Sequence, residues 1–206
     1  MILSPMKTWR ILGSLARLFR PHSELALDYT WGQLLRNVDS TIESRTYDQV
    51  EGALNKAMSW LEATAQHHPD YTDKLCKLAG LYQSLAGDNL AAEEILREAV
   101  KVAEEQDSRS GLSVAVPLNS LGLLLLQQRR SEEAEVLFER LLAIVENNLG
   151  SEHIEVATTL ENLAAVQRQT DRTDEASKTR ARATQIRRAA LKTTSNQETP
   201  HGAKTT

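Results

Sequence analysis

Histidine, cysteine and paired acidic residues are the side chains of this 206-residue sequence that could do chemistry, but their spacing assembles no reactive centre. The sequence has five histidines and one cysteine. A single thiol without clustered histidines cannot complete a structural zinc site, and it cannot form an internal disulfide. No HExxH motif, glycine-rich phosphate loop or nucleophile elbow is present. The sequence therefore predicts no enzyme activity, no cofactor and no metal.

The individual candidates also have structural explanations. Cys76 lies in a predicted helix with no base in view, which favours a buried small hydrophobe. His67, His68 and His153 fall between predicted helices, where we expect them to pack. The alternative is an unrecognised catalytic centre at Cys76 or at a histidine, and an activity lost in Cys76→Ser would reveal it.

The composition points to a helical protein. Aromatic residues make up 4%, and there are only nine glycines and five prolines, so little turn chemistry is available for a many-stranded sheet. Leu, Ala, Glu, Gln and Arg dominate, and these residues lose little side-chain freedom in a helix. No apolar run reaches the roughly 20 residues that span a bilayer. Together with the single cysteine, this predicts a reducing, cytoplasmic location.

An internal repeat sets the fold. Shifting the sequence by 42 residues superimposes small and apolar positions on one another. The pairs are Val114 on Val156, Ala115 on Ala157, Leu118 on Leu160, Leu121 on Leu163, Gly122 on Ala164, Ala134 on Ala176 and Ile144 on Ile186. Apolar residues in each unit recur at helical spacing on two stripes, which indicates two amphipathic helices joined by a short polar turn.

Small residues explain how the two helices can approach. Gly122 opposite Ala134, and Ala164 opposite Ala176, would let the backbones come close. This pattern is typical of tetratricopeptide repeats, whose usual period is about 34 residues. The additional residues here lie between hairpins, at 147–154.

The region around that connection resembles the 42-residue tetratricopeptide repeats of the kinesin light chain family. The resemblance rests on Leu149-Gly150, His153, Val156-Ala157 and Asn162-Leu163-Ala164, although Ile154 stands where that family usually has proline. It covers roughly residues 30–190 and is most specific over residues 114–188. It implies the fold, together with the general property of binding peptides or protein surfaces.

Two earlier copies extend the array. The first has Leu75, Leu78 and Ala79 in one helix and Ala92 and Leu96 in the next. Its first helix matches the following copy at a shift of 43 and its second at 42, which predicts one extra residue in the turn at residues 86–89. A fainter copy runs from Leu34 and Val38 to Val50, Leu54, Ala57 and Met58. We therefore expect an all-α, right-handed α-solenoid of antiparallel helix hairpins over residues 30–190, with three repeats plus one degenerate N-terminal repeat.

The expected binding site follows from this geometry. The first helix of each hairpin lines the concave side of a solenoid, so residues away from its packing stripe face the groove. The predicted groove residues are Gln83, Asn119, Leu123, Gln127, Glu161 and Arg168, with Cys76 and Ala165 nearby. Asn119 and Arg168 could bind a peptide backbone or an acidic side chain. Ordinary surface residues are the alternative.

The two ends carry positive charge. Residues 7–20, within an N-terminal region of residues 1–29, can form a basic amphipathic helix, which would cap the array, bind anionic lipid or target an organelle. The C-terminal helix carries Lys178, Arg180, Arg182, Arg187, Arg188 and Lys192 with no acid between Glu175 and Glu198. It is either a solvated helix or a dock for an acidic partner or RNA, and it lacks the aromatic residues that stack bases. Residues 191–206 should be a disordered polar tail.

The sequence predicts a scaffold or adaptor that binds a partner segment in the concave groove. The alternative is a membrane-peripheral assembly factor tethered by residues 7–20, in which case the location is a peripheral membrane, or an organelle if residues 1–23 are a targeting segment. The expected partner is a protein or peptide and not nucleic acid. Self-association by end-to-end stacking stays open.

Overall fold

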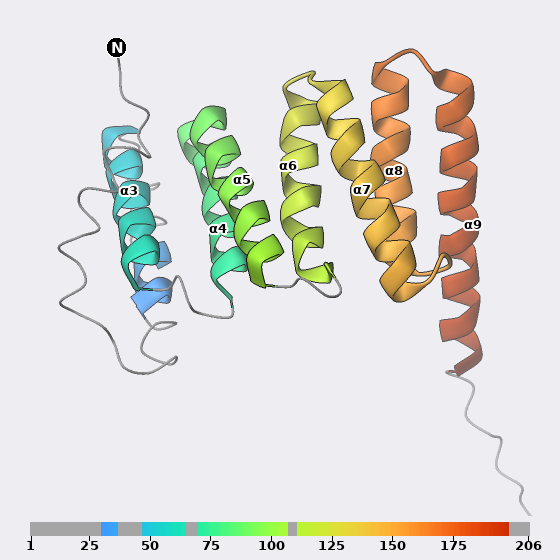
Figure 1. Cartoon of the computed structure of the whole chain (residues 1–206), viewed down its shortest axis with the longest axis horizontal. Helices are drawn as coiled ribbons and strands as arrows, with labels where there is room; N and C mark the ends of the chain where they lie inside the picture. Colours follow the sequence, from blue (N-terminus) through green and yellow to red (C-terminus); the bar gives the residue numbers. More distant parts are fainter. Residues whose placement is uncertain (1–29, 37–46, 65–69, 107–110, 198–206) are drawn as a thin grey trace, which may run out of the picture. The chain divides into compact units, whose positions relative to one another are not determined.

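The computed structural model describes residues 30–36, 47–64, 70–106 and 111–197, and in these ranges every regular element is a helix (Figure 1). The chain divides into two compact units at residues 106 and 107. Unit 1 contains helix α3 (Tyr47–Thr64), helix α4 (Tyr71–Leu81), the π-helical segment η2 (Tyr82–Ala86) and helix α5 (Asn89–Gln106). Unit 2 contains the short 3₁₀ segment η3 (Leu112–Val114) and helices α6 (Ala115–Gln127), α7 (Ser131–Leu149), α8 (Ile154–Gln169) and α9 (Thr173–Gln197). The predicted all-α helical repeat is confirmed.

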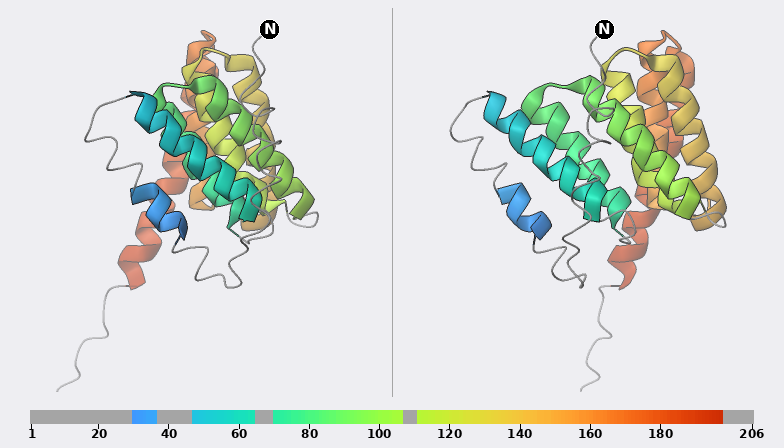
Figure 2. Two further views of the ribbon diagram at one scale, coloured as in Figure 1. Left: turned by 90° about the vertical axis from the view of Figure 1, so that its left-hand side faces the viewer. Right: turned by 60° about the vertical axis from the view of Figure 1, so that its left-hand side comes forward.

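Unit 1 holds the first full hairpin and the degenerate copy before it. Helices α4 and α5 pack against each other, and α3 packs against α4 and η2. The apolar positions predicted for the faint copy are buried on α3: Val50, Leu54, Ala57 and Met58. The helical segment at residues 30–36 lies beside α3, where Trp31 stacks on Trp60 with ring centroids 6.2 Å apart (Figure 2).

The extra residue of the first hairpin lies in its helix and not in its turn, so the predicted place of the insertion was wrong. Helix α4 continues into the π-helical segment Tyr82–Ala86, whose wider i→i+5 bonding accommodates one inserted residue. The closing backbone bond shows the difference. Asp88 N–H reaches back six residues to the Tyr82 carbonyl, whereas Arg130 N–H reaches back five residues to Leu125 and Arg172 N–H reaches five to Gln167.

All three hairpin turns contain one left-handed residue at the same repeat position. Gly87, Arg129 and Asp171 have φ of 63°, 65° and 61° and are 42 residues apart. A left-handed residue after a helix lets the following N–H groups bond back to the last carbonyls. Because glycine pays least for this conformation, Arg129 and Asp171 carry a backbone strain that Gly87 avoids.

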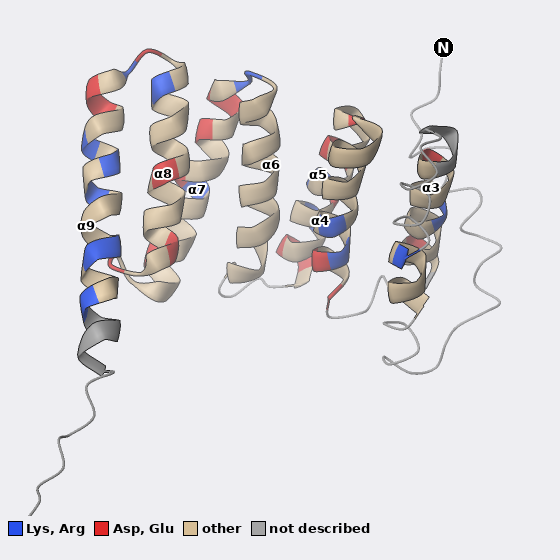
Figure 3. Ribbon diagram, turned by 180° about the vertical axis from the view of Figure 1, so that it is seen from behind, with Lys and Arg blue, Asp and Glu red and all other residues tan. Residues whose placement is uncertain are grey.

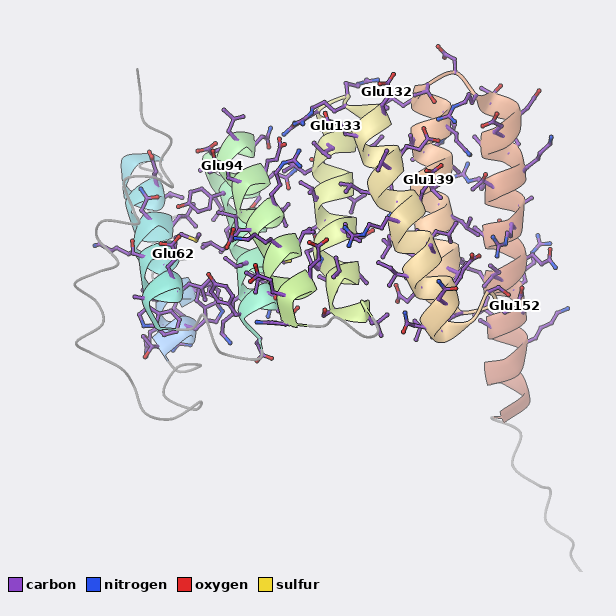
Figure 4. The ribbon with its side chains drawn as sticks, in the orientation of Figure 1. Glu62, Glu94, Glu132, Glu133, Glu139 and Glu152 are labelled. Atoms are coloured by element: carbon purple, nitrogen blue, oxygen red, sulfur yellow. The ribbon has the colours of Figure 1, made fainter. Side chains whose placement is uncertain are left out.

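Unit 1 is also held by a buried tyrosine. Tyr82 opens the π-helical segment, and its hydroxyl donates a hydrogen bond of 2.7 Å to Asn55 Oδ1 on α3. Burial, with the nearby carboxylates of Asp88, Glu51 and Glu62, raises the pKa of the Tyr82 hydroxyl (Glu62 is labelled in Figure 4). The residue therefore stays protonated and keeps donating to α3.

In unit 2 the close approach of α6 and α7 depends on Gly122 and Phe138. A Cβ atom on Gly122 would lie 2.7 Å from ring atoms Cε1 and Cζ of Phe138, whose side chain is fully buried. The nearest neighbour of Gly122 is thus Phe138 rather than Ala134. The following hairpin has Ala164 and Arg180 at these two positions, where no aromatic ring has to fit.

Helix α8 begins with a histidine cap. His153 has an extended backbone, φ −71° and ψ 148°, and its Nδ1 accepts a 3.2 Å hydrogen bond from the Glu155 N–H. Capping by a side-chain acceptor satisfies one of the open N–H groups at the start of a helix. His153 therefore has a structural role.

Helix α9 continues to Gln197, past the expected end of the repeat domain at residue 190. Alanine and leucine at Ala189, Ala190 and Leu191 favour this continuation. Residues 1–29, including the segment 7–20, and residues 198–206 lie outside the described ranges. Within the described ranges no helix combines the length and the hydropathy that a membrane span requires.

Candidate functional site

The first helix of the second hairpin, α6, exposes a stripe of mixed character. Val116, Asn119, Leu123 and Gln127 follow one another at helical spacing. The side chain of Val116 is 54% exposed and that of Leu123 is 37% exposed, while Asn119 is half-buried between them. Gln127 ends the stripe on the exposed side of the last turn.

A hydrogen bond joins this stripe to the next first helix. Asn162 Nδ2 on α8 donates to Asn119 Oδ1 on α6 over 2.8 Å. Helices α6 and α8 touch directly, so the bond marks the side of unit 2 on which its first helices meet. We call this side the first-helix face and define it by Val116, Asn119 and Leu123 of α6 with Thr158, Asn162 and Ala165 of α8.

The predicted residue Glu161 is engaged by the second helix of its own hairpin. Both carboxylate oxygens of Glu161 accept hydrogen bonds of 2.8 Å from the guanidinium of Arg187 on α9. The hydrogen bond to Glu161 raises the pKa of Arg187. Arg168, the last predicted residue of α8, is exposed in the final turn.

The remaining candidates lie in unit 1. Gln83 is half-buried in the π-helical segment, and Cys76 is half-buried on α4. Burial, and then the Asp73 carboxylate, raise the pKa of the Cys76 thiol to about 12. Because the thiolate is the reactive form, a thiol with this pKa is a poor nucleophile at neutral pH.

Polar links outside the first-helix face hold the two hairpins of unit 2 together. Arg172 at the start of α9 donates to Glu135 of α7 over 2.6 Å, and Arg182 donates to Glu146 over 2.6 Å. The Ser131 hydroxyl of α7 donates to Gln169 at the end of α8. The hydrogen bond to Glu135 raises the pKa of Arg172. These contacts join α7 to hairpin α8–α9, and an ordered arrangement of hairpins is what a binding surface needs to present its side chains in register.

Three residues of the first-helix face were not among the sequence candidates: Val116, Thr158 and Asn162. Arg187, which pairs with Glu161 beside this face, was not among them either. Val116 could have been found because it lies seven residues before Leu123, on the same helical face. The repeat shift did not indicate Asn162, because it places Glu161 at the counterpart of Asn119. No local signal pairs Arg187 with Glu161, because the contact joins different helices.

Other chemistry finds little support in the described residues. In those ranges no group of three histidine, cysteine or acidic side chains could hold a metal ion. An open hollow of about 640 Å³ lies along α9, lined by Ala181, Thr184, Gln185, Arg188, Ala189 and Lys192. It contains none of the predicted groove residues.

Comparison with known proteins agrees with the repeat. Residues 113–189 match the tetratricopeptide repeat family model. No curated protein matches the chain.

Solved structures with the same fold come from kinesin-light-chain-like proteins. A putative kinesin light chain with nearly identical TPR-like repeats from Podosopora anserina is 19% identical, with a TM-score of 0.55, covering 92% of this chain and 99% of that one. A variant of that protein is 18% identical, with a TM-score of 0.57 and coverage of 93% and 100%. BtubC (BKLC) from P. vanneervenii is 18% identical, with a TM-score of 0.50 and coverage of 98% and 95%.

At this level of identity the structural similarities establish the fold. The predicted resemblance to the repeats of the kinesin light chain family is confirmed, because residues 113–189 match the tetratricopeptide repeat model and the solved structures share the fold.

Proposed function

We propose that this chain is a protein-interaction scaffold or adaptor that binds a segment of a partner protein on the first-helix face of unit 2. Tetratricopeptide arrays generally bind other proteins through the surface formed by successive repeats. The observation that carries the proposal is the Asn119–Asn162 bond with exposed apolar side chains beside it.

The chemistry of this face suits an extended peptide. The bond between the two amides uses the Asn119 oxygen and one N–H of Asn162. An amide has two N–H donors and two lone pairs on its oxygen, so the pair keeps donors and acceptors for a peptide backbone. Val116 and Leu123 flank the amides on α6 and can bury apolar side chains of the peptide.

Charge at the edge of the face would select among such segments. Arg168 is exposed near the end of α8 and can bind an acidic side chain of the partner. Glu161 already pairs with Arg187, so it contributes less attraction for basic segments than its sequence position suggested. Gln127 is the last residue of α6, and its side-chain amide can both donate and accept hydrogen bonds.

The test compares two apolar-to-acid substitutions on different sides of unit 2. Partners are recovered by affinity purification and quantified by mass spectrometry, first with the wild-type chain and then with Asn119→Ala plus Leu123→Asp. Val136→Asp is the matched control, because Val136 is 64% exposed on the second helix α7. Asn119→Ala plus Arg168→Glu tests the amide and the charge.

We expect the two first-helix variants to lose a defined set of partners that Val136→Asp retains. Circular dichroism should show the same helix content in all of them, because the substituted side chains are exposed or half-buried. Unchanged partner recovery in both first-helix variants would refute the assignment of the binding surface.

A further inference from the structure

One side of hairpin α8–α9 is turned away from α7. By its repeat position this side corresponds to the surface on which a following hairpin would pack, but its side chains are polar and charged. Arg182 marks the other side of α9, since it reaches Glu146 of α7. Half a helical turn around α9 lie Arg180, Thr184 and Arg187. With Arg188 of α9 and Glu161 and Arg168 of α8 they form what we call the end face.

The repeat relates this face to one that is filled inside unit 2. Helix α8 packs against α7 and touches α6. A shift of 42 residues superimposes α8 and α9 on α6 and α7. The end face of hairpin α8–α9 therefore corresponds to the side of hairpin α6–α7 against which α8 packs. Another helix could lie against the end face in the same way.

The two faces differ in polarity, because apolar residues of α7 are replaced by polar and charged residues at the corresponding positions of α9. Phe138 and Val145 of α7 are buried, at 0% and 3% exposure, and Leu142 is half-buried. The residues at the corresponding places on α9 are Arg180, Arg187 and Thr184. An apolar helix such as α8 would bury two guanidinium groups there at high cost. The end face therefore does not suit a further repeat of the same kind.

Positive charge dominates the end face. Of its charged groups, only Arg187 and Glu161 are paired with each other, at 2.8 Å. Arg168, Arg180 and Arg188 take part in no ion pair with the residues that the structure describes. Figure 3 shows the Lys and Arg positions, in blue, along the ribbon of α9. The face thus offers three cations to an incoming partner.

We propose that the end face binds an acidic helical segment of a partner protein, which lies against α8 and α9 as α8 lies against α6 and α7. Helical geometry follows from the repeat relation, and acidic character follows from the three cations and the guanidinium–carboxylate pairing they favour. Nucleic acid fits less well, because α8 and α9 contain no aromatic residue on which a base could stack.

The test uses a defined probe and two substitutions on one helix. The probe is a fluorescein-labelled, end-capped alanine-based peptide of 16 residues, the length of α8, with glutamates along one helical face. Its affinity for the full chain is measured by fluorescence anisotropy at low and physiological salt. Arg180→Glu reverses a charge on the end face, whereas Lys178→Glu makes the same charge change on a face of α9 turned away from it.

We expect Arg180→Glu to raise the dissociation constant by about fivefold or more, and Lys178→Glu to change it by less than about twofold. Binding should weaken as salt increases, since the attraction is largely electrostatic. Leu123→Asp on the first-helix face should leave this affinity unchanged, which separates the two proposals even though Arg168 borders both faces. Should Arg180→Glu reduce helix content, Arg180→Gln gives the same comparison without an added acid.

Three results would overturn the proposal. Equal weakening by both charge reversals would mean that the probe senses net charge only. Tighter binding of a 12-nucleotide oligouridine that is lost in Arg180→Glu would assign the face to RNA. Concentration-dependent dimers in analytical ultracentrifugation that are abolished by Arg180→Glu would assign it to a second copy of this chain.

Discussion

Replacing Gly122 by alanine tests how closely α6 and α7 pack. The new Cβ would lie 2.7 Å from two ring atoms of Phe138 and 3.2 Å from a third, where ordinary contacts begin at 3.4 Å. Because Phe138 is fully buried, the ring has no open space to move into, and the two helices must separate.

The expected magnitude follows from two opposing contributions. Overpacking of a core by one methyl group typically costs about 1–3 kcal/mol. Alanine in place of glycine inside a helix gains about 1 kcal/mol. Because the 2.7 Å contact lies well inside the 3.4 Å limit, we expect an overpacking cost of about 2–3 kcal/mol. Gly122→Ala should therefore lower the free energy of unfolding by about 1–2 kcal/mol, measured by urea denaturation followed by circular dichroism.

Two comparisons isolate the contact. Gly52→Ala on α3 is the matched control, because a Cβ there meets nothing within 4 Å, and it should raise the free energy of unfolding by about 0.5–1 kcal/mol. On a Phe138→Leu background, Gly122→Ala should become neutral or stabilising. The other hairpins already pair an alanine with a non-aromatic residue, Ala79 with Leu96 and Ala164 with Arg180. A Gly122→Ala protein as stable as the wild type, or an equal loss on both backgrounds, would refute this reasoning.

Three further predictions concern the backbone and the thiol. Arg129→Gly should stabilise the chain by about 0.5–1 kcal/mol and so raise the thermal unfolding midpoint, because φ at Arg129 is 65° and glycine adopts this conformation without strain. An unchanged midpoint would mean that the turn carries no strain. Ile154→Pro should stabilise by about 0.4–1 kcal/mol relative to Ile154→Ala, because proline suits the first position of a helix and ψ of 148° at His153 suits the residue before it; a loss would contradict this. Burial raises the pKa of Cys76 from 9.0 to about 12, so between these pH values the unfolded chain ionises its thiol more readily than the folded chain. The stability that this group contributes is fully present below pH 9 and is lost as the pH rises toward 12. Cys76→Ala should therefore reduce the fall in the free energy of unfolding, measured by urea denaturation at alkaline pH. In the native chain the thiol should react with a disulfide reagent at pH 8 more slowly than in urea, and equal rates would contradict the burial.

The hairpins could be predicted from sequence because each helix repeats its own burial pattern. Leu118 and Leu160, or Ala134 and Ala176, lie at equivalent positions and are all buried. Periodicity of this kind reports which face of a helix is packed, and it survives even in the faint copy on α3.

Positions inside the hairpins were harder to predict where geometry departs from a regular helix. The change of shift from 43 to 42 showed that the first hairpin has one extra residue, but a shift cannot distinguish a longer turn from a π-helical segment. Gly87 at the same repeat position as Arg129 and Asp171 shows that the turn itself is the same in all three copies. The pairing of Gly122 with Phe138 was missed for a similar reason, since small residues indicate close approach without naming the group that approaches.

The assignment of binding residues from repeat position alone has a physical limit. Asn119 and Glu161 are equivalent by the 42-residue shift, yet Asn119 bonds to the next first helix while Glu161 bonds to Arg187 of its own hairpin. The difference arises because the first position has a neighbouring hairpin within unit 2 and the second has none there. A repeat fixes where a side chain lies, whereas its partner depends on which elements surround that copy. The sequence does indicate that α9 lacks a packed neighbour of the same kind. Arg180 and Arg187 stand at positions where such a neighbour would require apolar residues.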